Sequence, residues 1–303
     1  LEFPNPQRRT DMNKELEFTG ERFTPECERE IWYEHMHRYA FARQFCRGKI
    51  VLDAACGEGF GSAMLAEVAA HVVGVDISAQ SVAHAGNRYG ERENLEFKAS
   101  DACALDVPDG QFDVVVSFET IEHLENQEGL LAEFRRVLND DGLLVISSPD
   151  KAEYSDRQGF ENPYHVRELY RDEFLDLLKP RFPAVRLLGQ ALAFQSVIFD
   201  EEDLRRAICQ GLSRDGEYRE GRFRQPAMYL LALCAAREAL LPDLSGRLWL
   251  FDDDEGSVYA HYHHEIRKNM AAGTVLAEKQ AEIDALKNRL SRRPWWQRWF
   301  GRN

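Results

Sequence analysis

The sequence predicts an α/β fold built on a doubly wound, mostly parallel sheet of seven strands. Strand and helix patterns alternate from Lys49 to Ser148, which is the order that produces a parallel sheet with helices on both faces. The strand expected at Phe112 to Ser117 carries a continuous apolar run, as expected where both faces are covered. A glycine-rich turn joins the first strand to the helix after it, at the place where such sheets bind their ligands.

A helical region precedes the sheet. Aromatic and apolar residues recur at helical spacing between Phe23 and Cys46, which predicts one or two helices. We expect residues 12–48 to form a helical lid over the site. The lid side chains that are candidates to contact a cofactor or acceptor are Tyr33, His35, Arg38 and Tyr39. Ordinary packing of an amphipathic helix is an equal alternative for each of them.

The chain then alternates between strands and helices. Apolar and β-branched runs predict strands at Lys49–Ala54, His71–Val75, Leu95–Ala99, Phe112–Ser117 and Gly142–Ser148. Helical spacing predicts helices at Ser62–Ala70, Ser78–Tyr89 and Gln127–Leu138. Two later segments, Val185–Phe199 and Met228–Cys234, are expected to complete the sheet at its far edge. The charged residues 200–226 between them are expected to form an inserted helix and loop near the mouth of the site.

The C-terminal part has a different character. Residues 255–290 contain no proline and predict one long helix. Leu276, Ile283 and Leu290 recur every seven residues with Leu286 at a second seam position, but Lys279 occupies the other, so the coiled-coil pattern is short and weak. The expected organisation is an arm or added leader at 1–11, the lid at 12–48, an α/β domain at 49–240, a helical stalk at 241–290 and a tail at 291–303.

Charge and composition exclude several classes of protein. The 303 residues include 38 Lys and Arg against 52 Asp and Glu, and the resulting net charge of −14 would repel nucleic acid. The longest apolar stretch, Met228 to Ala236, is far shorter than the roughly 20 residues that span a bilayer. The six cysteines lack disulfide or zinc-finger spacing and the chain opens on polar residues, which favours a cytoplasmic location.

The strongest chemical signal is the turn from Val51 to Gly61, with the sequence VLDAACGEGFG. Glycines in a turn between strand and helix let the backbone approach a ligand and point N–H groups at it. Asp76 ends the next strand about 20 residues on, where a carboxylate accepts hydrogen bonds from ribose hydroxyls. Asp101 and Ala102 follow the third strand, where an adenine edge can be read. These strand ends predict one crevice for a nucleotide-type ligand; the alternative is a turn that only packs helix on strand.

Four segments carry a resemblance to a known family. VLDAACGEGFGS, VVGVDIS, SDACALDVPDGQFDVVVSFETIEHL and LNDDGLLVISSPD resemble, in order, the motifs of class I S-adenosylmethionine-dependent methyltransferases. The resemblance implies a Rossmann-like methyltransferase fold with S-adenosylmethionine as cofactor. It implies that Asp53, Gly57 and Gly59 bind the cofactor in the turn, with the two glycines at the methionine moiety. Asp76 would hold the ribose, and Phe118 would lie near the sulfonium. The residues implied at the adenine are Ile77, Asp101 and Ala102.

Two features set this motif apart from related patterns. Ala55 stands where many members of the methyltransferase family have glycine, so we expect a slightly wider turn. The spaced GxGxxG of dehydrogenases is absent, which disfavours a nicotinamide cofactor.

The segment Glu119 to His123 leaves the fourth strand above the expected methyl group. In a helical turn Glu119, Glu122 and His123 would share one face, and these donors suit a divalent cation such as Mg²⁺ or Mn²⁺ that lowers the pKa of a hydroxyl. The spelling ExxEH resembles the metal motif of ubiquinone-pathway O-methyltransferases and small-RNA 2′-O-methyltransferases, and the latter resemblance implies His165 as a fourth ligand. Acidic residues also stabilise a helix N-terminus without metal. In that case His165 or His123 is the candidate general base.

The tail suggests where the protein acts. Residues 281–303 hold six basic and two acidic groups, and tryptophans interleaved with arginines suit an anionic bilayer surface. Docking of these aromatic side chains on the protein's own core or on a dimer partner is the alternative. The order of domain, stalk and tail resembles O-antigen methyltransferases of bacterial surface-polysaccharide assembly. This resemblance implies O-methylation of a sugar hydroxyl on a surface glycan or its lipid-linked precursor, at the inner face of the membrane.

The sequence also allows two other hypotheses about function. The acceptor can instead be a small phenolic or secondary metabolite, and such an enzyme would not need the tail. A third hypothesis is a catalytically silent scaffold that uses the same fold and the long helix to recruit partners. Independently of the function, a homo-oligomer can form through the C-terminal helix. Binding of the cofactor without transfer to any acceptor would favour the scaffold.

Overall fold

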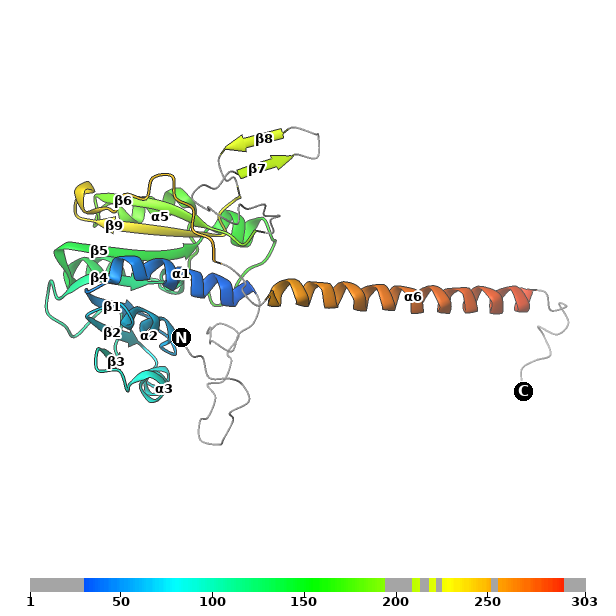
Figure 1. Ribbon diagram of the computed structural model, residues 1–303, viewed down its shortest axis with the longest axis horizontal. Coiled ribbons are helices and arrows are strands. Elements are labelled where there is room, and N and C mark those ends of the chain that lie inside the picture. Colours follow the sequence, from blue (N-terminus) through cyan, green and yellow to red (C-terminus); the bar gives the residue numbers. More distant parts are fainter. Residues whose placement is uncertain (1–29, 194–208, 213–217, 222–224, 252–255, 292–303) are drawn as a thin grey trace, which may run out of the picture. The chain divides into compact units, whose positions relative to one another are not determined.

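The computed structural model describes residues 30–193, 209–212, 218–221, 225–251 and 256–291 (Figure 1). The expected arm at 1–11, the lid before Glu30 and the tail from residue 292 on lie outside the described residues. The chain divides into two compact units, Leu1–Phe251 and Asp252–Asn303, each of which is considered by itself.

The centre of the first unit is a sheet of seven strands in the order β3-β2-β1-β4-β5-β9-β6 (Figure 1). Its strands are β1 (Ile50–Ala54), β2 (His71–Asp76), β3 (Leu95–Ala99), β4 (Phe112–Ser117), β5 (Leu138–Pro149), β6 (Ala184–Gln190) and β9 (Tyr229–Ala235). Strand β9 is antiparallel to both of its neighbours, and the pairs among β1 to β5 are parallel. The strand order reverses between β1 and β4, and a doubly wound sheet opens its ligand crevice at such a point.

Helices cover both faces of this sheet. They are α1 (Glu30–Cys46), α2 (Phe60–Ala66), α3 (Ala79–Tyr89), α4 (Gln127–Val137) and α5 (Arg171–Leu178). Side chains alternate between two buried clusters along each strand, as the period of two requires. Val51 and Val114 pack with α1 and α2 on one side, while Leu52 and Val115 pack with α4 and α5 on the other. The first unit therefore has the three-layer architecture that the sequence predicts.

Several element boundaries differ from the prediction. Strand β5 starts at Leu138, earlier than the expected Gly142, because α4 ends at Val137 and Leu138 pairs with Phe112. Strand β6 ends at Gln190, well before the expected Phe199.

The prediction of a helix within residues 200–226 was wrong for the part of that insertion which the structure describes. Strands β7 (Cys209–Leu212) and β8 (Tyr218–Gly221) pair there as an antiparallel hairpin. The Asp215-Gly216 pair between them is a strong hairpin signal, which outweighs the helix-forming composition of the surrounding sequence.

The described part of the second unit is the helix α6 (Ser257–Ser291), which has 35 residues and confirms the long helix expected from the sequence. Short 3₁₀ or π turns, η1 (Ile121–His123), η2 (Ala152–Asp156) and η3 (Glu238–Leu240), complete the first unit. Within the described ranges, none of the helices combines the length and apolar character needed to span a bilayer.

Candidate active site

The glycine-rich turn lies at the carboxyl end of β1 and leads into α2. Ala55, Gly57 and Gly59 all have positive φ, at 60°, 56° and 89°. A Cβ on Gly59 would lie 2.7 Å from the Ala85 Cβ atom, so the turn packs tightly against α3 at this point. A Cβ on Gly57 would meet nothing within 4 Å. Gly57 thus faces open space, where a ligand can approach its backbone.

Asp76, at the end of β2, is bound to this turn. Its Oδ2 accepts a hydrogen bond from the Gly57 N–H at 2.9 Å, and its Oδ1 accepts one from the Ser78 N–H at 2.8 Å. A carboxylate has about four acceptor positions, so two remain for ribose hydroxyls. The structure therefore brings together two of the residues that the sequence predicted to share one crevice.

The residues expected to bind adenine follow the same sheet edge. Ile77 is 78% exposed, which leaves a large apolar side chain in solvent beside Asp76. Ala99, the last residue of β3, pairs with Asp76 in register, and Asp101 and Ala102 follow two residues later. Asp101 uses one carboxylate oxygen to accept the Cys103 N–H at 2.8 Å. An apolar side chain and a carboxylate thus stand on neighbouring strand ends.

Asp53 lies inside the protein. Its side chain is fully buried and accepts hydrogen bonds from the Tyr39 hydroxyl at 3.1 Å and the Ser62 hydroxyl at 2.6 Å. Burial raises the pKa of Asp53 to about 6. The Tyr39 ring also packs edge-on against Phe118, with 5.0 Å between the ring centroids. In this structure Asp53 therefore connects α1 and α2 to β1 and positions the turn from within.

Arg38 of α1 forms the centre of a buried polar cluster that sequence reasoning recognised only in part. Its side chain is 1% exposed, its Nη1 donates to the Gln190 Oε1 at 2.9 Å, and its guanidinium lies 4.7 Å from the centroid of the Tyr229 ring. The Glu119 Oε1 lies 3.9 Å from the same Nη1. The Nε and Nη2 atoms are buried and have no hydrogen-bond partner within the described part of the chain. Two strong donors therefore remain for a ligand.

Glu34, one turn before Arg38, belongs to the same cluster. The Tyr229 hydroxyl donates to its Oε2 at 3.0 Å, and Gln190 donates to its backbone carbonyl at 2.9 Å. Burial raises the pKa of Glu34 to about 7, although Arg38 opposes this rise. The spacing of Glu34 and Arg38 on one helix face is visible in the sequence, but their partners lie more than 150 residues away.

Glu119 does not join a helical turn with Glu122 and His123, which corrects that part of the prediction. The turn η1 begins only at Ile121, and Glu119 has a φ of 50°. Its Oε1 accepts a hydrogen bond from the Ser147 hydroxyl at 2.6 Å. This backbone conformation keeps Glu119 out of the turn η1 and leaves its carboxylate close enough to both Arg38 and Glu122 to interact with them electrostatically.

Glu122, His123 and His165 meet as the sequence predicted. One ligand atom from each lies within 4.8 Å of the others. Glu122 is fully buried, and neither of its carboxylate oxygens has a hydrogen-bond partner among the described residues. Burial, and then the neighbouring Glu119 carboxylate, raise the pKa of Glu122 well above its ordinary value. The His123 Nε2 lies 4.0 Å from the Glu122 Oε1. A buried carboxylate that lacks hydrogen bonds among the described residues, beside two imidazoles, fits a cation.

The loop that carries His165 is fastened to η1 by its backbone. The Glu122 carbonyl accepts hydrogen bonds from the Val166 N–H at 2.8 Å and the Arg167 N–H at 3.0 Å. The His123 Nδ1 lies 3.1 Å from the Tyr164 carbonyl oxygen. These contacts explain how histidines 42 positions apart come to lie with their ring centroids 4.9 Å apart.

His165 also has a carboxylate partner that sequence reasoning missed. Its Nδ1 lies 2.6 Å from the Glu168 Oε1, and the Asn162 amide donates to its Nε2 at 3.0 Å. The Ser155 hydroxyl donates to the other Glu168 oxygen at 2.5 Å. Because a carboxylate only accepts, Nδ1 carries the proton and Nε2 is the basic nitrogen. The spacing of Asn162, His165 and Glu168, three residues apart in the sequence, is the feature from which this hydrogen-bonded group could have been predicted.

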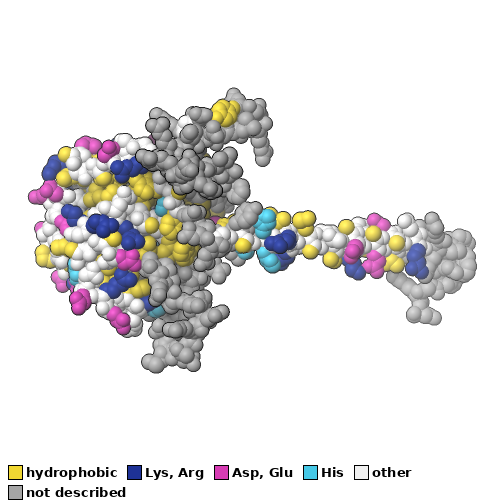
Figure 2. Space-filling model, in the orientation of Figure 1, with side chains coloured by type: hydrophobic (Ala, Val, Ile, Leu, Met, Phe, Trp, Pro, Cys, Tyr) yellow, Lys and Arg dark blue, Asp and Glu magenta, His cyan; other side chains and the backbone are white. Residues whose placement is uncertain are grey.

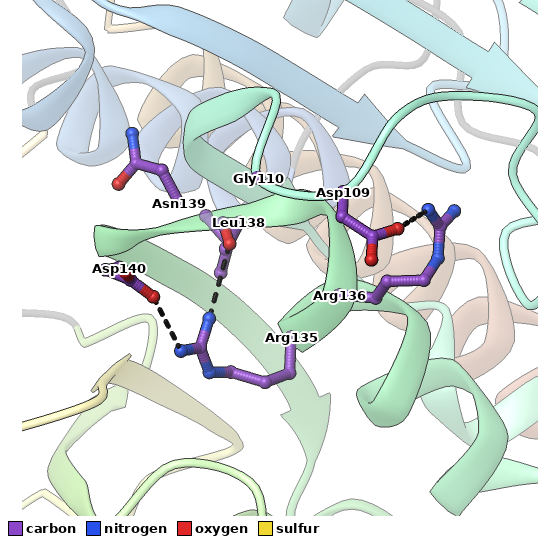
Figure 3. A pocket seen from close by; sticks show the side chains of 7 residues that line it. All are labelled: Asp109, Gly110, Arg135, Arg136, Leu138, Asn139 and Asp140. Carbon is purple, nitrogen blue, oxygen red and sulfur yellow. Dashed lines mark hydrogen bonds and ion pairs between the residues drawn. The ribbon is translucent and has the colours of Figure 1, made fainter.

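A surface hollow lies at the opposite edge of the sheet, around the amino ends of β4 and β5 (Figure 3). Its lining residues are Asp109, Gly110, Arg135, Arg136, Leu138, Asn139 and Asp140. Arg136 pairs with Asp109 at 2.6 Å and Arg135 pairs with Asp140 at 3.6 Å (Figure 3). The arginines of this hollow are thus already neutralised, and ligands of this fold bind at the carboxyl ends of the strands. We therefore place the active site at the other edge.

Comparisons with known proteins show what this chain is similar to. Residues 52–146 match the family described as "Methyltransferase domain". A probable S-adenosylmethionine-dependent methyltransferase of Mycobacterium tuberculosis is 38% identical over 176 residues, 57% of this chain and 63% of the relative. Phosphoethanolamine N-methyltransferase 1 of Arabidopsis thaliana is 33% identical over 125 residues, 38% of this chain and 26% of that protein. The YcgJ protein of Bacillus subtilis has a solved structure with a TM-score of 0.50 and 20% identity, covering 67% of this chain and all of YcgJ.

The structural match confirms the fold class, and residues 52–146 are similar to methyltransferase domains. The match to the mycobacterial relative spans less than two thirds of that protein's length. The matched segment, residues 52–146, includes the glycine-rich turn, Asp76, Asp101, Phe118 and the Glu122–His123 pair, and it ends before His165.

Proposed function

We propose that this chain is an S-adenosylmethionine-dependent O-methyltransferase whose acceptor is a sugar hydroxyl of a surface glycan or its lipid-linked precursor. The observation that carries the proposal is the cluster of Glu122, His123 and His165 at the carboxyl end of β4. A buried carboxylate and two imidazoles beside a cofactor crevice are the groups that activation of a hydroxyl requires.

The residues of the crevice fit the cofactor. Gly57 offers open backbone and Asp76 offers free acceptor positions, while Ile77 offers an apolar surface for a base. The Arg38 Nε and Nη2 atoms, which have no hydrogen-bond partner within the described ranges, suit the carboxylate of the methionine moiety. When bound, S-adenosylmethionine supplies a methyl group on a positively charged sulfur.

The charge of the site also suits a cationic methyl donor. Two buried acidic side chains, Glu34 and Glu122, and the half-buried Glu119 interact electrostatically with the Arg38 guanidinium. In a poorly solvated site, such an excess of acidic groups favours a bound positive charge. Binding of the donor would in turn favour the ionised forms of these carboxyls.

His165 provides a route for the acceptor proton. Its Nε2 would take the proton of the hydroxyl while the hydroxyl oxygen forms the new bond to carbon. Glu168 would hold the imidazole in the required tautomer and stabilise its positive charge, which is the role that a carboxylate plays behind a catalytic histidine. The Asn162 amide would have to release Nε2 first.

A divalent cation is the alternative way to activate the hydroxyl. Glu122, His123 and His165 would hold Mg²⁺ or Mn²⁺, and Glu119 would have to turn away from Ser147 to join them. A metal supplies a positive charge that lowers the pKa of a coordinated hydroxyl. Two hydroxyls of a sugar diol would suit such a site.

A small-molecule acceptor is the second candidate. It is favoured by the similarity to phosphoethanolamine N-methyltransferase 1, whose name gives a small acceptor. The glycan hypothesis is supported instead by the basic, aromatic sequence of residues 291–303, which a small-molecule enzyme would not need.

Calorimetric titration of S-adenosylhomocysteine into the full chain tests the donor site. We expect binding in EDTA that Asp76→Ala weakens at least tenfold, with Asp109→Ala in the opposite hollow as the matched control. A separate Mn²⁺ titration that gives heat in the wild type and none in Glu122→Gln would assign the metal route. If the wild type gives no heat of Mn²⁺ binding, His165 is assigned as the base that takes the proton of the acceptor hydroxyl. If S-adenosylhomocysteine does not bind, the methyltransferase hypothesis is excluded and the scaffold hypothesis is favoured.

Methyl transfer then tests the acceptor class. With radiolabelled S-adenosylmethionine, we expect label in extracted lipid-linked glycans and a loss of about 10²- to 10⁴-fold in His165→Ala, with donor binding unchanged. If the radioactive methyl group is found only in low-mass phenolic acceptors, the protein is a small-molecule methyltransferase instead.

A further inference from the structure

We propose that α6 pairs with α6 of a second copy of this chain as a parallel, in-register, two-stranded coiled coil. This inference is independent of the proposed reaction. It starts from the length of the helix, whose 35 residues correspond to about 52 Å.

Helix α6 exposes apolar side chains along its length (Figure 2). Tyr262, Leu276, Ile283 and Leu286 are 51%, 70%, 45% and 48% exposed. A helix normally buries such side chains against a partner, because packing of the apolar face provides most of its stability. Large apolar side chains at regular spacing on an exposed helix face therefore indicate an interface.

The spacing of these residues follows a heptad. Tyr262, Asn269, Leu276, Ile283 and Leu290 occupy one seam position, a, and Val258, Glu265, Ala272, Lys279 and Leu286 occupy the other, d. The stretch from Leu276 to Leu290 is apolar at four of its five seam positions. Pairing is therefore strongest in the C-terminal half of the helix.

The seam holds three polar residues, Glu265, Asn269 and Lys279, and Asn269 bears on the partner and its direction. Only in a parallel, in-register pair do two Asn269 side chains meet across the axis, where each amide hydrogen-bonds the other and specifies two strands. Lys279 already directs its ammonium to Glu282, with 2.8 Å between Nζ and Oε2. Its charge can thus stay at the rim of the seam while its methylene groups line it.

Charges beside the seam favour the same arrangement. In a parallel dimer, the residue before each a position lies near the residue five places later on the partner helix. Glu282 and Lys287 satisfy this rule with opposite charges. This charge pair therefore favours a second copy of this chain as the partner of α6 in the parallel, in-register arrangement.

The mass of the full chain in solution is the first test. At tens of micromolar, light scattering should give about 70 kDa, twice the 34.9 kDa of one chain. The double variant Leu276→Asp with Ile283→Asp should give the single-chain mass, and Ala281→Asp on the outer face should stay dimeric. Both should unfold in urea at the same midpoint as the wild type, followed by tryptophan and tyrosine fluorescence, which would show that the α/β unit is folded. A wild-type mass of one chain, or a doubled mass that the double variant keeps, overturns the proposal.

Disulfide trapping tests the register. Ile283→Cys should form a covalent dimer under mild oxidation, because facing a positions in a parallel pair lie within disulfide reach. Ala281→Cys should give no more covalent dimer than the wild type, whose native cysteines set the background. A dimer by mass in which Ile283→Cys also stays at background would overturn the parallel, in-register arrangement.

Discussion

Ala55 bears backbone strain in the glycine-rich turn. Its φ of 60° lies in the left-handed region, which costs a residue with a Cβ about 1–2 kcal/mol. Ala55→Gly relieves this strain and adds about 0.5–1 kcal/mol of unfolded-state entropy. We expect a net gain of about 0.5–1 kcal/mol in the free energy of unfolding, measured with urea.

Gly57→Ala is the matched reverse change. Gly57 has a φ of 56° and open space around its Cβ position, so strain is introduced there without a clash. This variant should lose stability. If Ala55→Gly instead lowers the free energy of unfolding, the positive φ of Ala55 does not strain the folded protein.

Glu34 makes the stability of the protein depend on pH. Because burial raises its folded-state pKa from about 4.5 to about 7, the folded chain holds a proton between these values that the unfolded chain has lost. Its contribution to stability is therefore present at pH 4.5 and lost as the pH rises to 7. Wild type should lose stability relative to Glu34→Gln over this interval.

Urea unfolding of both proteins from pH 5 to 8 measures this difference. Asp53 and Glu122 also have raised pKa values, but they are present in both proteins and their contributions cancel. Stability curves that run parallel across the range would show that Glu34 titrates normally.

The residues of the site differ in how far the sequence could predict them. Gly57 and Asp76 follow strands directly, so the local pattern placed both at one sheet edge. Gln190 and Tyr229 could not be found in this way, because their hydrogen bonds to Glu34 join positions 156 and 195 apart. Only the folded sheet, which places β6 and β9 beside β5, brings them to α1.

At the scale of elements, contact between α1 and α2 depends on one glycine. A Cβ on Gly61 would lie 2.0 Å from the Cζ atom of the Tyr39 ring. Gly61→Ala would therefore push Tyr39 away and weaken its hydrogen bond to Asp53. We expect a loss of about 1–3 kcal/mol in unfolding free energy and weaker binding of S-adenosylhomocysteine.

Gly86 supplies the control for this change. It lies within α3, and a Cβ there would meet nothing within 4 Å. Gly86→Ala should raise stability by about 0.5–1 kcal/mol, because alanine is the better helix former. Equal effects of the two substitutions on stability would exclude the packing explanation.

Elements were predictable where a local period dominates. Strands β3 and β4 match their predicted bounds, since β3 alternates apolar and charged residues and β4 carries a continuous run of three valines. The conformation of residues Glu119 to His123 could not be predicted from the sequence, because a positive φ at Glu119 interrupts the expected helix. The hydrogen bond of Glu119 to Ser147 on the neighbouring strand accompanies that conformation, and no helical period reveals it.

For the whole molecule, the distribution of charge leads to the last prediction. The chain has a net charge of −14, yet residues 292–303 contain four arginines and no acidic residue. Each arginine near an anionic bilayer is worth about 1 kcal/mol, and this attraction is screened by salt. In the proposed parallel dimer two such tails leave the same end of the paired helices, so they can bind one surface together and gain avidity.

Vesicle sedimentation measures this attraction. Full-length protein should sediment with vesicles that contain one quarter phosphatidylglycerol at 50 mM NaCl and remain in solution at 500 mM. A chain that ends at Ser291 should not sediment, and the monomeric Leu276→Asp, Ile283→Asp variant should sediment more weakly because it presents one tail at a time. Equal sedimentation of the shortened chain would assign the tail to another contact. Equal sedimentation of the monomeric variant would leave the tail as a membrane contact and show that pairing adds nothing to it.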